Sequence, residues 1–318
     1  MNGRRKVRRH GGTKGRKGTK GRGTQSSIHN PQSSIRRWTL EHGVVDFSAA
    51  PVVMGVLNVT PDSFSDGGLY VAVDDAVRRA DQMVGQGAGI IDVGPESTRP
   101  GSPPVPAETQ IERIQPVIRA IRRRHPNVPI SIDTRCAQVA RAAIELGADI
   151  INDVSALRHD EEMAALAKAT AAPVILMHMR GTPRTMQVDL ENDSYIDVVG
   201  EIVSFLTERM AFAESAGVSR HRMAIDPGIG FGKTLQHNLA ILWDLKALTG
   251  LGVPVVAGAS RKSFLGTILN RPDPRDRAAG SIACAVAAVL QGARVIRTHD
   301  VADMVDAVRV AAAIRAAK

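Results

Sequence analysis

Residues 129–178 read PISIDTRCAQVARAAIELGADIINDVSALRHDEEMAALAKATAAPVILMH, and this stretch sets the pattern of the whole chain. Short apolar runs at 129–133, 149–153 and 173–178 are separated by longer segments with helical spacing. Continuously apolar strands that alternate with helices are typical of a parallel sheet covered on both faces. The stretch therefore predicts consecutive units of a strand followed by a helix.

The same alternation continues in both directions and gives eight units. Working outward, we predict strands at 52–58, 89–94, 129–133, 149–153, 173–178, 223–226, 253–258 and 294–298. Helices are predicted at 73–87, 107–125, 136–147, 160–170, 192–217, 235–250, 275–292 and 301–316. Eight such units indicate an α/β fold of the (β/α)8 TIM barrel type, which typically needs about 250 residues. A doubly wound sheet is the alternative, but it rarely supplies eight units in this order.

The chain before these units has a different composition. Residues 1–37 hold 12 of the 41 Lys and Arg residues and no Asp or Glu, which leaves 29 basic against 32 acidic residues in the remainder. We predict a disordered basic tail over 1–37, able at most to contact polyanions such as RNA weakly, and an ordered catalytic domain over 38–318. Around His42-Gly43, residues 38–47 predict a short hairpin that covers the bottom of this domain.

Composition also argues against several classes of protein. No run of about 18 apolar residues is present, so a membrane-spanning helix is not expected. Two cysteines, Cys136 and Cys284, cannot build a disulfide framework or a multi-cysteine zinc site, and a reducing, cytoplasmic compartment is the simplest expectation. The mildly acidic domain argues against a broad nucleic-acid-binding face.

Polar or charged side chains follow almost every predicted strand. They are Asn58, Asp92 with Glu96, Asp133, Asn152 with Asp153, His178, Asp226, Ser260 to Lys262, and Arg297 with His299. Barrel enzymes carry their chemistry at the carboxyl ends of the strands. These side chains are therefore expected to converge on one active site.

One part of this set suits a flat, donor-rich ring. Asp133, Asn152 and Asp226 offer acceptors to a heterocycle such as a pterin or a guanine-like base. Lys262 could donate to a carbonyl or nitrogen of the same ring. The sequence therefore predicts a heterocycle-binding half of the site.

The other part suits a phosphate group. Arg297 and His299, together with Arg99, are expected to supply positive charge to a phosphate or diphosphate. Asn58 and Asp62 could hold Mg²⁺ with the help of a substrate diphosphate, because this ion keeps few protein ligands. Residues 58–68 and 96–104 are rich in Gly, Pro, Ser and Thr and are predicted to close over the site and exclude water.

Several segments resemble the dihydropteroate synthase family. They are MGVLNVTPDSFSDGG (54–68), ESTRPG (96–101), SIDT (131–134), INDV (151–154), LMHMRGTPRTMQ (176–187), DPGIGFGKT (226–234), GASRKSFLG (258–266) and RTHD (297–300). The likeness runs from about Trp38 to the end of the chain, in order and without large gaps. The resemblance implies a pterin-binding (β/α)8 barrel, in agreement with the strand count.

The resemblance also implies an activity in folate biosynthesis. The enzyme would be a transferase that joins 6-hydroxymethyl-7,8-dihydropterin diphosphate to 4-aminobenzoate and releases 7,8-dihydropteroate and diphosphate. It would work with Mg²⁺, form a homodimer and be a target of sulfonamides. The family is thought to break the C–O bond before the amine attacks, so its main catalytic task would be electrostatic.

The family's functional residues can be carried over motif by motif. The residues implied to bind the pterin are Asp133, Asn152, Met177, Asp226, Phe231 and Lys262. Those implied to bind the diphosphate are Asn58, Arg99, Arg297 and His299, with Mg²⁺ near Asn58. Those implied to form the 4-aminobenzoate site are Phe64, Thr98, Pro100 and Ser260. Catalysis would fall to Arg99, Lys262, Arg297 and His299.

The sequence departs from the family pattern at one position, and rival interpretations exist. The family usually has two glycines before the Glu of the second loop, whereas Pro95 stands between Gly94 and Glu96 here. Proline fixes φ and lacks an N–H group, so we expect this loop to start along a different route. The rivals are a methyltransferase that uses methyltetrahydrofolate, a non-catalytic paralogue, and a polyanion-binding protein that works through the tail.

Overall fold

Eight parallel strands of the computed structural model close into a barrel, as the alternating pattern predicts. The structure describes residues 34–60, 68–97, 101–186, 190 and 195–317. The barrel strands are β3 (Val52–Asn58), β4 (Ile90–Gly94), β5 (Ile130–Asp133), β6 (Ile150–Asp153), β7 (Val174–Met177), β8 (Met223–Asp226), β9 (Val256–Ala257) and β10 (Val295–Thr298). Their order is β8-β7-β6-β5-β4-β3-β10-β9, and a parallel bridge between Ile225 and Val255 joins the two ends. The fold is therefore the predicted (β/α)8 TIM barrel.

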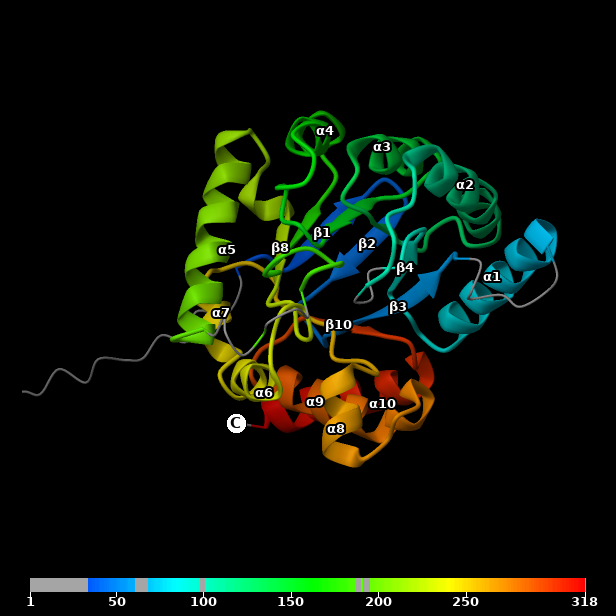
Figure 1. Ribbon diagram of the computed structural model, residues 1–318. Helices are drawn as coiled ribbons and strands as arrows, with labels where there is room; N and C mark the ends of the chain where they lie inside the picture. The colour runs from blue at the N-terminus through cyan, green and yellow to red at the C-terminus, as the bar shows by residue number, and fades with distance from the viewer. Residues whose placement is uncertain (1–33, 61–67, 98–100, 187–189, 191–194, 318) are drawn as a thin grey trace, which may run out of the picture. The chain divides into compact units, whose positions relative to one another are not determined.

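Helices surround the strands and form the outer layer (Figure 1). They are α1 (Gly68–Gly85), α2 (Ala107–Arg124), α3 (Ala137–Glu145), α4 (Glu162–Thr170), α5 (Val198–Ser215), α6 (Leu235–Trp243), α7 (Lys246–Thr249), α8 (Ser263–Leu269), α9 (Ala278–Leu290) and α10 (Val301–Ala316). Two short 3₁₀ helices are η2 (Arg220–Arg222) and η3 (Pro274–Arg277). None of the described helices is both long and apolar enough to cross a membrane.

Some element boundaries differ from the prediction. The helix expected at 235–250 is divided into α6 and α7, because Asp244 leaves the helical conformation with φ −117° and ψ 35°. Helix α8 was not predicted, since seven residues are too few to show a helical period. Helix α5 begins at Val198, where the Asp197 side chain accepts a hydrogen bond from the Gly200 N–H and so caps the helix.

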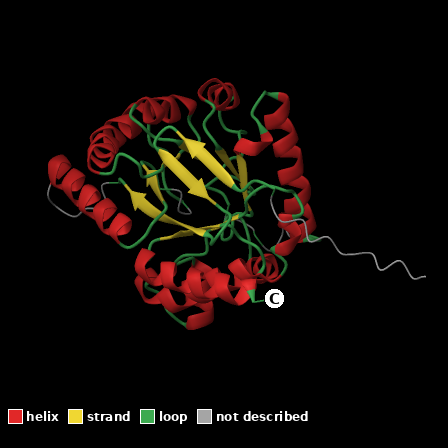
Figure 2. Ribbon diagram, turned by 180° about the vertical axis from the view of Figure 1, so that it is seen from behind, coloured by secondary structure: helices red, strands yellow, loops and turns green. Residues whose placement is uncertain are grey.

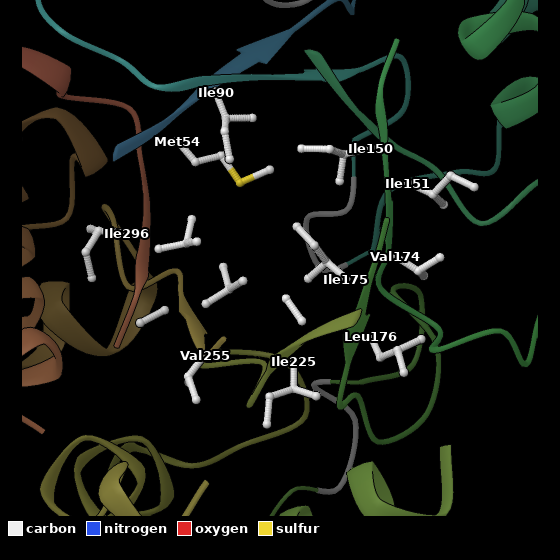
Figure 3. Packing of buried hydrophobic residues seen from close by; sticks show 14 of the residues in the cluster. Met54, Ile90, Ile150, Ile151, Val174, Ile175, Leu176, Ile225, Val255 and Ile296 are labelled. Carbon is white, nitrogen blue, oxygen red and sulfur yellow. The ribbon is translucent and has the colours of Figure 1, made fainter. Parts of the chain in front are cut away.

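The barrel interior is filled by aliphatic side chains from neighbouring strands. Met54, Ile90, Ile150 and Ile175 come from four strands and gather in the space between them (Figure 3). These side chains are at most 1% exposed. Because successive side chains of a strand point to opposite faces, the residues between them pack outward against the helices. The interior is thus a solid core, and any binding site must lie at an end of the barrel.

A two-stranded hairpin covers one end of the barrel (Figure 2). It consists of β1 (Arg37–Leu40) and β2 (Gly43–Asp46), paired antiparallel. The Trp38 indole N–H donates to the His221 carbonyl at 2.9 Å, and His42 Nδ1 lies 2.9 Å from Asp149 Oδ1. His221 lies two residues before β8 and Asp149 lies directly before β6, so the hairpin covers the amino-terminal end of the barrel. The predicted covering role is confirmed, and the opposite end is left for the site.

The boundary of the domain lies slightly before Trp38. Ile35 is buried and β1 begins at Arg37, so these residues pack with the barrel. The greater part of the predicted tail, residues 1–33, lies outside the described residues.

Candidate active site

The carboxyl ends of the barrel strands bring the predicted polar side chains together. Arg297 on β10 reaches across the barrel to two carboxylates, with Nε 2.7 Å from Asp92 Oδ2 and Nη2 2.8 Å from Asp133 Oδ2. Asn152 on β6 donates from Nδ2 to the same Asp92 oxygen at 3.2 Å. One network therefore joins β4, β5, β6 and β10, which confirms that these strand ends meet.

Asp92 is the centre of this network, although we predicted no role for it beyond a place at a strand end. Its side chain is fully buried and accepts hydrogen bonds from both Arg297 and Asn152. A carboxylate removed from water needs such partners, because burial of an unpaired charge is costly. Asp92 therefore orients two residues that were assigned to two different substrate groups.

Asp133 presents a free acceptor to the interior of the site. Its Oδ2 binds Arg297, whereas its buried Oδ1 has no hydrogen-bond partner among the described residues. Burial raises the pKa of the carboxyl group to about 7, against the lowering effect of Arg297 and with a further rise from Asp92. Since buried acceptors are nearly always satisfied, this oxygen is suited to an N–H donor of a ligand.

Asp226 and Lys262 are two further polar groups of the site, and each lies close enough to the other and to Arg297 to shift its pKa. Asp226 Oδ1 accepts from the Gly228 N–H at 2.7 Å, and burial raises the pKa of its carboxyl group. A Cβ added at Gly258 would lie 3.7 Å from the Arg297 Cβ and 3.9 Å from Asp226 Oδ2. These are ordinary van der Waals distances, and they place the side chains of Arg297 and Asp226 next to the end of β9. Burial lowers the pKa of Lys262 to about 8, with Arg297 adding to the effect and Asp226 opposing it.

An apolar wall lies beside these polar groups. The Lys262 ammonium group is 4.0 Å from the centroid of the Phe231 ring. Phe231 packs in a small apolar cluster that is separate from the barrel core and also contains Val154, Met177, Met179 and Met186. Acceptors next to an apolar wall match the needs of a flat ring that carries donors on its edge.

His299 differs from the prediction that it would supply positive charge. Burial lowers the pKa of its imidazole to about 3, with further lowering by Arg297, Arg261 and Lys262, so the ring is neutral near pH 7. Its Nδ1 is 3.0 Å from Ser260 Oγ, which also accepts from the His299 N–H at 3.1 Å. With Ser260 donating to Nδ1, the ring proton is carried by Nε2 and is available to a ligand oxygen.

The turn after β6 adopts an unusual backbone conformation. Ala156 and Leu157 have φ values of 53° and 62°, in the left-handed region that residues other than glycine disfavour. Asp153 accepts from the Leu157 N–H at 2.8 Å, and Arg209 donates to the Ala156 carbonyl at 2.9 Å and to that of Leu157 at 3.2 Å. These buried contacts fix the chain that follows Asn152. The two contacts from Arg209 join residues 53 and 52 positions apart, so sequence spacing did not reveal them.

A buried lysine near the site was also missed. Lys233 is 3% exposed, and burial lowers the pKa of its ammonium group to about 7. Its Nζ lies 3.0 Å from His178 Nδ1, whose imidazole has its pKa lowered to about 2, mainly by burial and then by Lys233. The sequence contained Lys233 within a glycine-rich segment, but nothing in that pattern indicated burial.

The loops contribute fewer described residues. Phe64, Thr98, Arg99 and Pro100 lie outside the described residues. Asn58 ends β3 beside Gly94, and the Val59 N–H donates to the Gly94 carbonyl at 2.8 Å. Pro95 starts the second loop without a positive φ, and its carbonyl accepts from Arg113 at 2.9 Å. Across the described parts of the chain, no cluster of three or more His, Cys, Asp or Glu side chains is placed to hold a metal ion.

Comparison with known proteins relates this geometry to one family. Residues 54–299 match the family of pterin binding enzymes. The dihydropteroate synthase of Escherichia coli (strain K12) is 47% identical over 268 residues, which cover 84% of this chain and 93% of that protein. The structure of the Yersinia pestis dihydropteroate synthase with a sulfonamide drug is 41% identical with a TM-score of 0.82, covering 89% of this chain and 100% of that one. The Xanthomonas albilineans dihydropteroate synthase with 4-aminobenzoic acid is 41% identical with a TM-score of 0.80, covering 90% and 98%. The chain belongs to the pterin-binding enzymes and, within them, to the dihydropteroate synthase family.

Proposed function

We propose that the protein joins 6-hydroxymethyl-7,8-dihydropterin diphosphate to 4-aminobenzoate and releases 7,8-dihydropteroate and diphosphate. The observation that carries the proposal is the buried Oδ1 of Asp133, which has no hydrogen-bond partner among the described residues, in a site that also contains the apolar cluster of Met177 and Phe231. A pterin edge carries N–H donors for such an oxygen, and its ring can pack on such a wall. The relatives at 41–47% identity support the same reaction.

The pterin is assigned to the half of the site that holds acceptors. Asp133 and Asp226 accept from the ring N–H and amino groups, and the Asn152 amide adds a polar contact. Lys262 donates to the ring while its ammonium group stays over the Phe231 face. Asp133, Asn152 and Asp226 are buried, and Lys262 is half-buried over the Phe231 ring. The groups are already oriented, so binding requires little rearrangement.

The diphosphate is assigned to Arg297 and His299, with Arg99 from the second loop. Arg297 keeps its positive charge at all relevant pH values, because Asp92 and Asp133 raise its pKa against the effect of burial. His299 donates from its neutral ring, and the approach of a negative diphosphate raises its pKa. The site thus gathers positive charge where the leaving group develops negative charge.

Asn58 is the residue proposed to hold Mg²⁺. It offers one amide oxygen at the carboxyl end of β3, and the described residues provide no carboxylate cluster for a metal. This donor set fits an ion that is held mainly by phosphate oxygens and water. When bound, Mg²⁺ neutralises part of the diphosphate charge.

The aminobenzoate site is proposed at the mouth of the barrel, with Ser260 and with Phe64, Thr98 and Pro100 of the two loops. A relative of this chain has been solved with 4-aminobenzoic acid. In the reaction, the bond between the pterin methylene and the diphosphate oxygen breaks, and the amine nitrogen forms the new C–N bond and loses one proton. The amine is already neutral at pH 7, so the chain needs no strong general base.

A direct assay tests this function. Purified protein is incubated with the pterin diphosphate, 4-aminobenzoate and Mg²⁺, and dihydropteroate and diphosphate are expected in equal amounts. Lys262→Met is expected to abolish product formation, whereas Lys246→Met, at an exposed lysine, serves as the matched control. Absence of product from wild-type protein that still binds the pterin would contradict the proposed reaction.

We also propose that two copies associate through the late helices. Large apolar side chains are exposed on α6, α8, α9 and α10, which lie on one side of the barrel (Figure 1); they are Trp243, Ile268, Leu290, Val310 and Ile314. Burial of such a face favours association. Sedimentation equilibrium is expected to show a dimer. The double variant Val310→Asp with Ile314→Asp is expected to shift the equilibrium toward the monomer. An unchanged dimer in this double variant would exclude α10 from the interface.

A further inference from the structure

We propose that Lys233 is a positioning residue that sets the pterin-binding wall by bridging the end of β7 to the loop after β8. This inference rests on the proposed function, because it concerns how the same site holds the pterin ring. It assigns a role to a side chain that lies behind the wall and is not part of the predicted pterin set.

The contacts of Lys233 define the bridge. Its Nζ lies 3.0 Å from His178 Nδ1, 3.4 Å from the His178 carbonyl oxygen and 3.0 Å from the Phe231 carbonyl oxygen. In its ammonium form, Lys233 has three N–H donors and no acceptor, so these three acceptors satisfy it completely. The Lys233 side chain is 3% exposed. If the lysine is removed, bulk water therefore cannot take its place as the donor to these three acceptors.

The bridge holds a loop whose backbone runs unusually close to β7. Gly228 has a φ of +66°, and a Cβ added there would lie 1.9 Å from the His178 carbonyl oxygen. Gly232 has a φ of +65°, and its added Cβ would lie 2.8 Å from the Arg180 carbonyl oxygen. Only glycine permits this approach, and Lys233 supplies side-chain hydrogen bonds that maintain it.

The same loop carries two parts of the pterin half of the site. The Gly228 N–H donates to Asp226 Oδ1 at 2.7 Å, and Phe231 presents its ring to Lys262 at 4.0 Å. A shift of the loop away from His178 would therefore move two groups together: the Gly228 N–H that donates to Asp226, and the ring of Phe231. The aminobenzoate residues proposed above come from other loops and do not depend on this contact.

The packing around His178 explains why it can serve as a fixed anchor. Its ring meets Phe205 edge to face with centroids 4.8 Å apart and lies 6.0 Å from the Tyr195 ring. The imidazole is neutral at pH 7, so its Nδ1 can accept from Lys233. Lys233 thus joins the loop to a side chain that α5 already holds in place.

The test replaces the lysine by a side chain of similar length without donors. In Lys233→Met the dissociation constant of 6-hydroxymethylpterin, followed by its fluorescence, is expected to rise about tenfold, as is usual when one member of a hydrogen-bond network is removed. The KM for the pterin diphosphate should rise in parallel, whereas the KM for 4-aminobenzoate should stay within about twofold of the wild-type value. Lys246→Met is the control and should change neither constant.

A second variant separates positioning from general loss of stability. His178→Leu removes one of the three acceptors, the ring nitrogen, and keeps the lysine. The double variant should weaken pterin binding no more than the stronger single variant. Wild-type pterin affinity in folded Lys233→Met, equal rises in both KM values, or additive effects in the double variant would each overturn the inference. A wild-type protein that binds no pterin would instead refute the proposed function.

Discussion

Replacement of Asp92 by Asn tests whether one buried carboxylate organises both halves of the site. Asp92 accepts from Arg297 Nε at 2.7 Å and from Asn152 Nδ2 at 3.2 Å. Both donors approach Oδ2, so an asparagine keeps these two bonds only if its single side-chain oxygen takes that position. The change removes the negative charge next to Arg297, and in the other amide orientation an NH₂ group would face both donors.

The structure sets the expected size of this effect. Removing one partner from a buried ion pair costs about 3–5 kcal/mol. Arg297 keeps its bond to Asp133 at 2.8 Å, so we expect a smaller loss of about 2–3 kcal/mol of unfolding free energy, which is the size of one hydrogen bond to a charged group. Displacement of the guanidinium group by about 1 Å should also lower kcat about 100-fold.

Urea denaturation and steady-state kinetics measure these two quantities in the same preparation. Asp273→Asn is the matched control, because Asp273 also pairs with an arginine, Arg275, but on the surface. That variant should match the wild type in both assays, since exposed ion pairs contribute little. Wild-type kcat in Asp92→Asn would refute the view that Asp92 positions Arg297, and wild-type stability would refute the energetic reasoning.

Two further predictions concern pH and the backbone. The pKa of Asp133 is raised to about 7 by burial and that of Lys262 is lowered to about 8, so pterin affinity should rise as pH passes about 7 and fall above about 8. Asp133→Asn should abolish the rise in pterin affinity near pH 7. If the rise is unchanged in this variant, a group other than Asp133 causes it. At the end of α4, Ala171 has a φ of +53°, and Ala171→Gly should raise the unfolding free energy by about 1 kcal/mol. Ala313→Gly inside α10 should lower the unfolding free energy by about the same amount, as measured by urea denaturation. If both variants changed the unfolding free energy in the same direction, the explanation from backbone conformation would be contradicted.

The sequence predicted the fold well because its signals are local. Continuous apolar runs and helical spacing located all eight barrel strands, and the turn at His42-Gly43 located the hairpin. The errors fall where local signals are weak. Helix α8 is too short to show a period, and the break between α6 and α7 at Asp244 depends on the packing of the surrounding barrel.

For the site, the sequence determined which chemistry is present but not how the groups are paired. It placed Asp133, Asn152, Asp226 and Arg297 at strand ends, because the carboxyl ends of parallel strands must meet at one edge. It could not decide that Arg297 would bind a residue 205 positions away, since the register of a closed barrel depends on all its strands.

The tertiary structure alone decided the charge states and the supporting contacts. His299 was expected to be cationic, but burial among Arg297, Arg261 and Lys262 makes it neutral. Lys233 reads as an ordinary surface residue in the sequence, yet the loop after β8 buries it against His178. The physical reason is the same in both cases: desolvation and hydrogen bonding depend on neighbours from distant strands, whereas periodicity and turn chemistry are properties of adjacent residues.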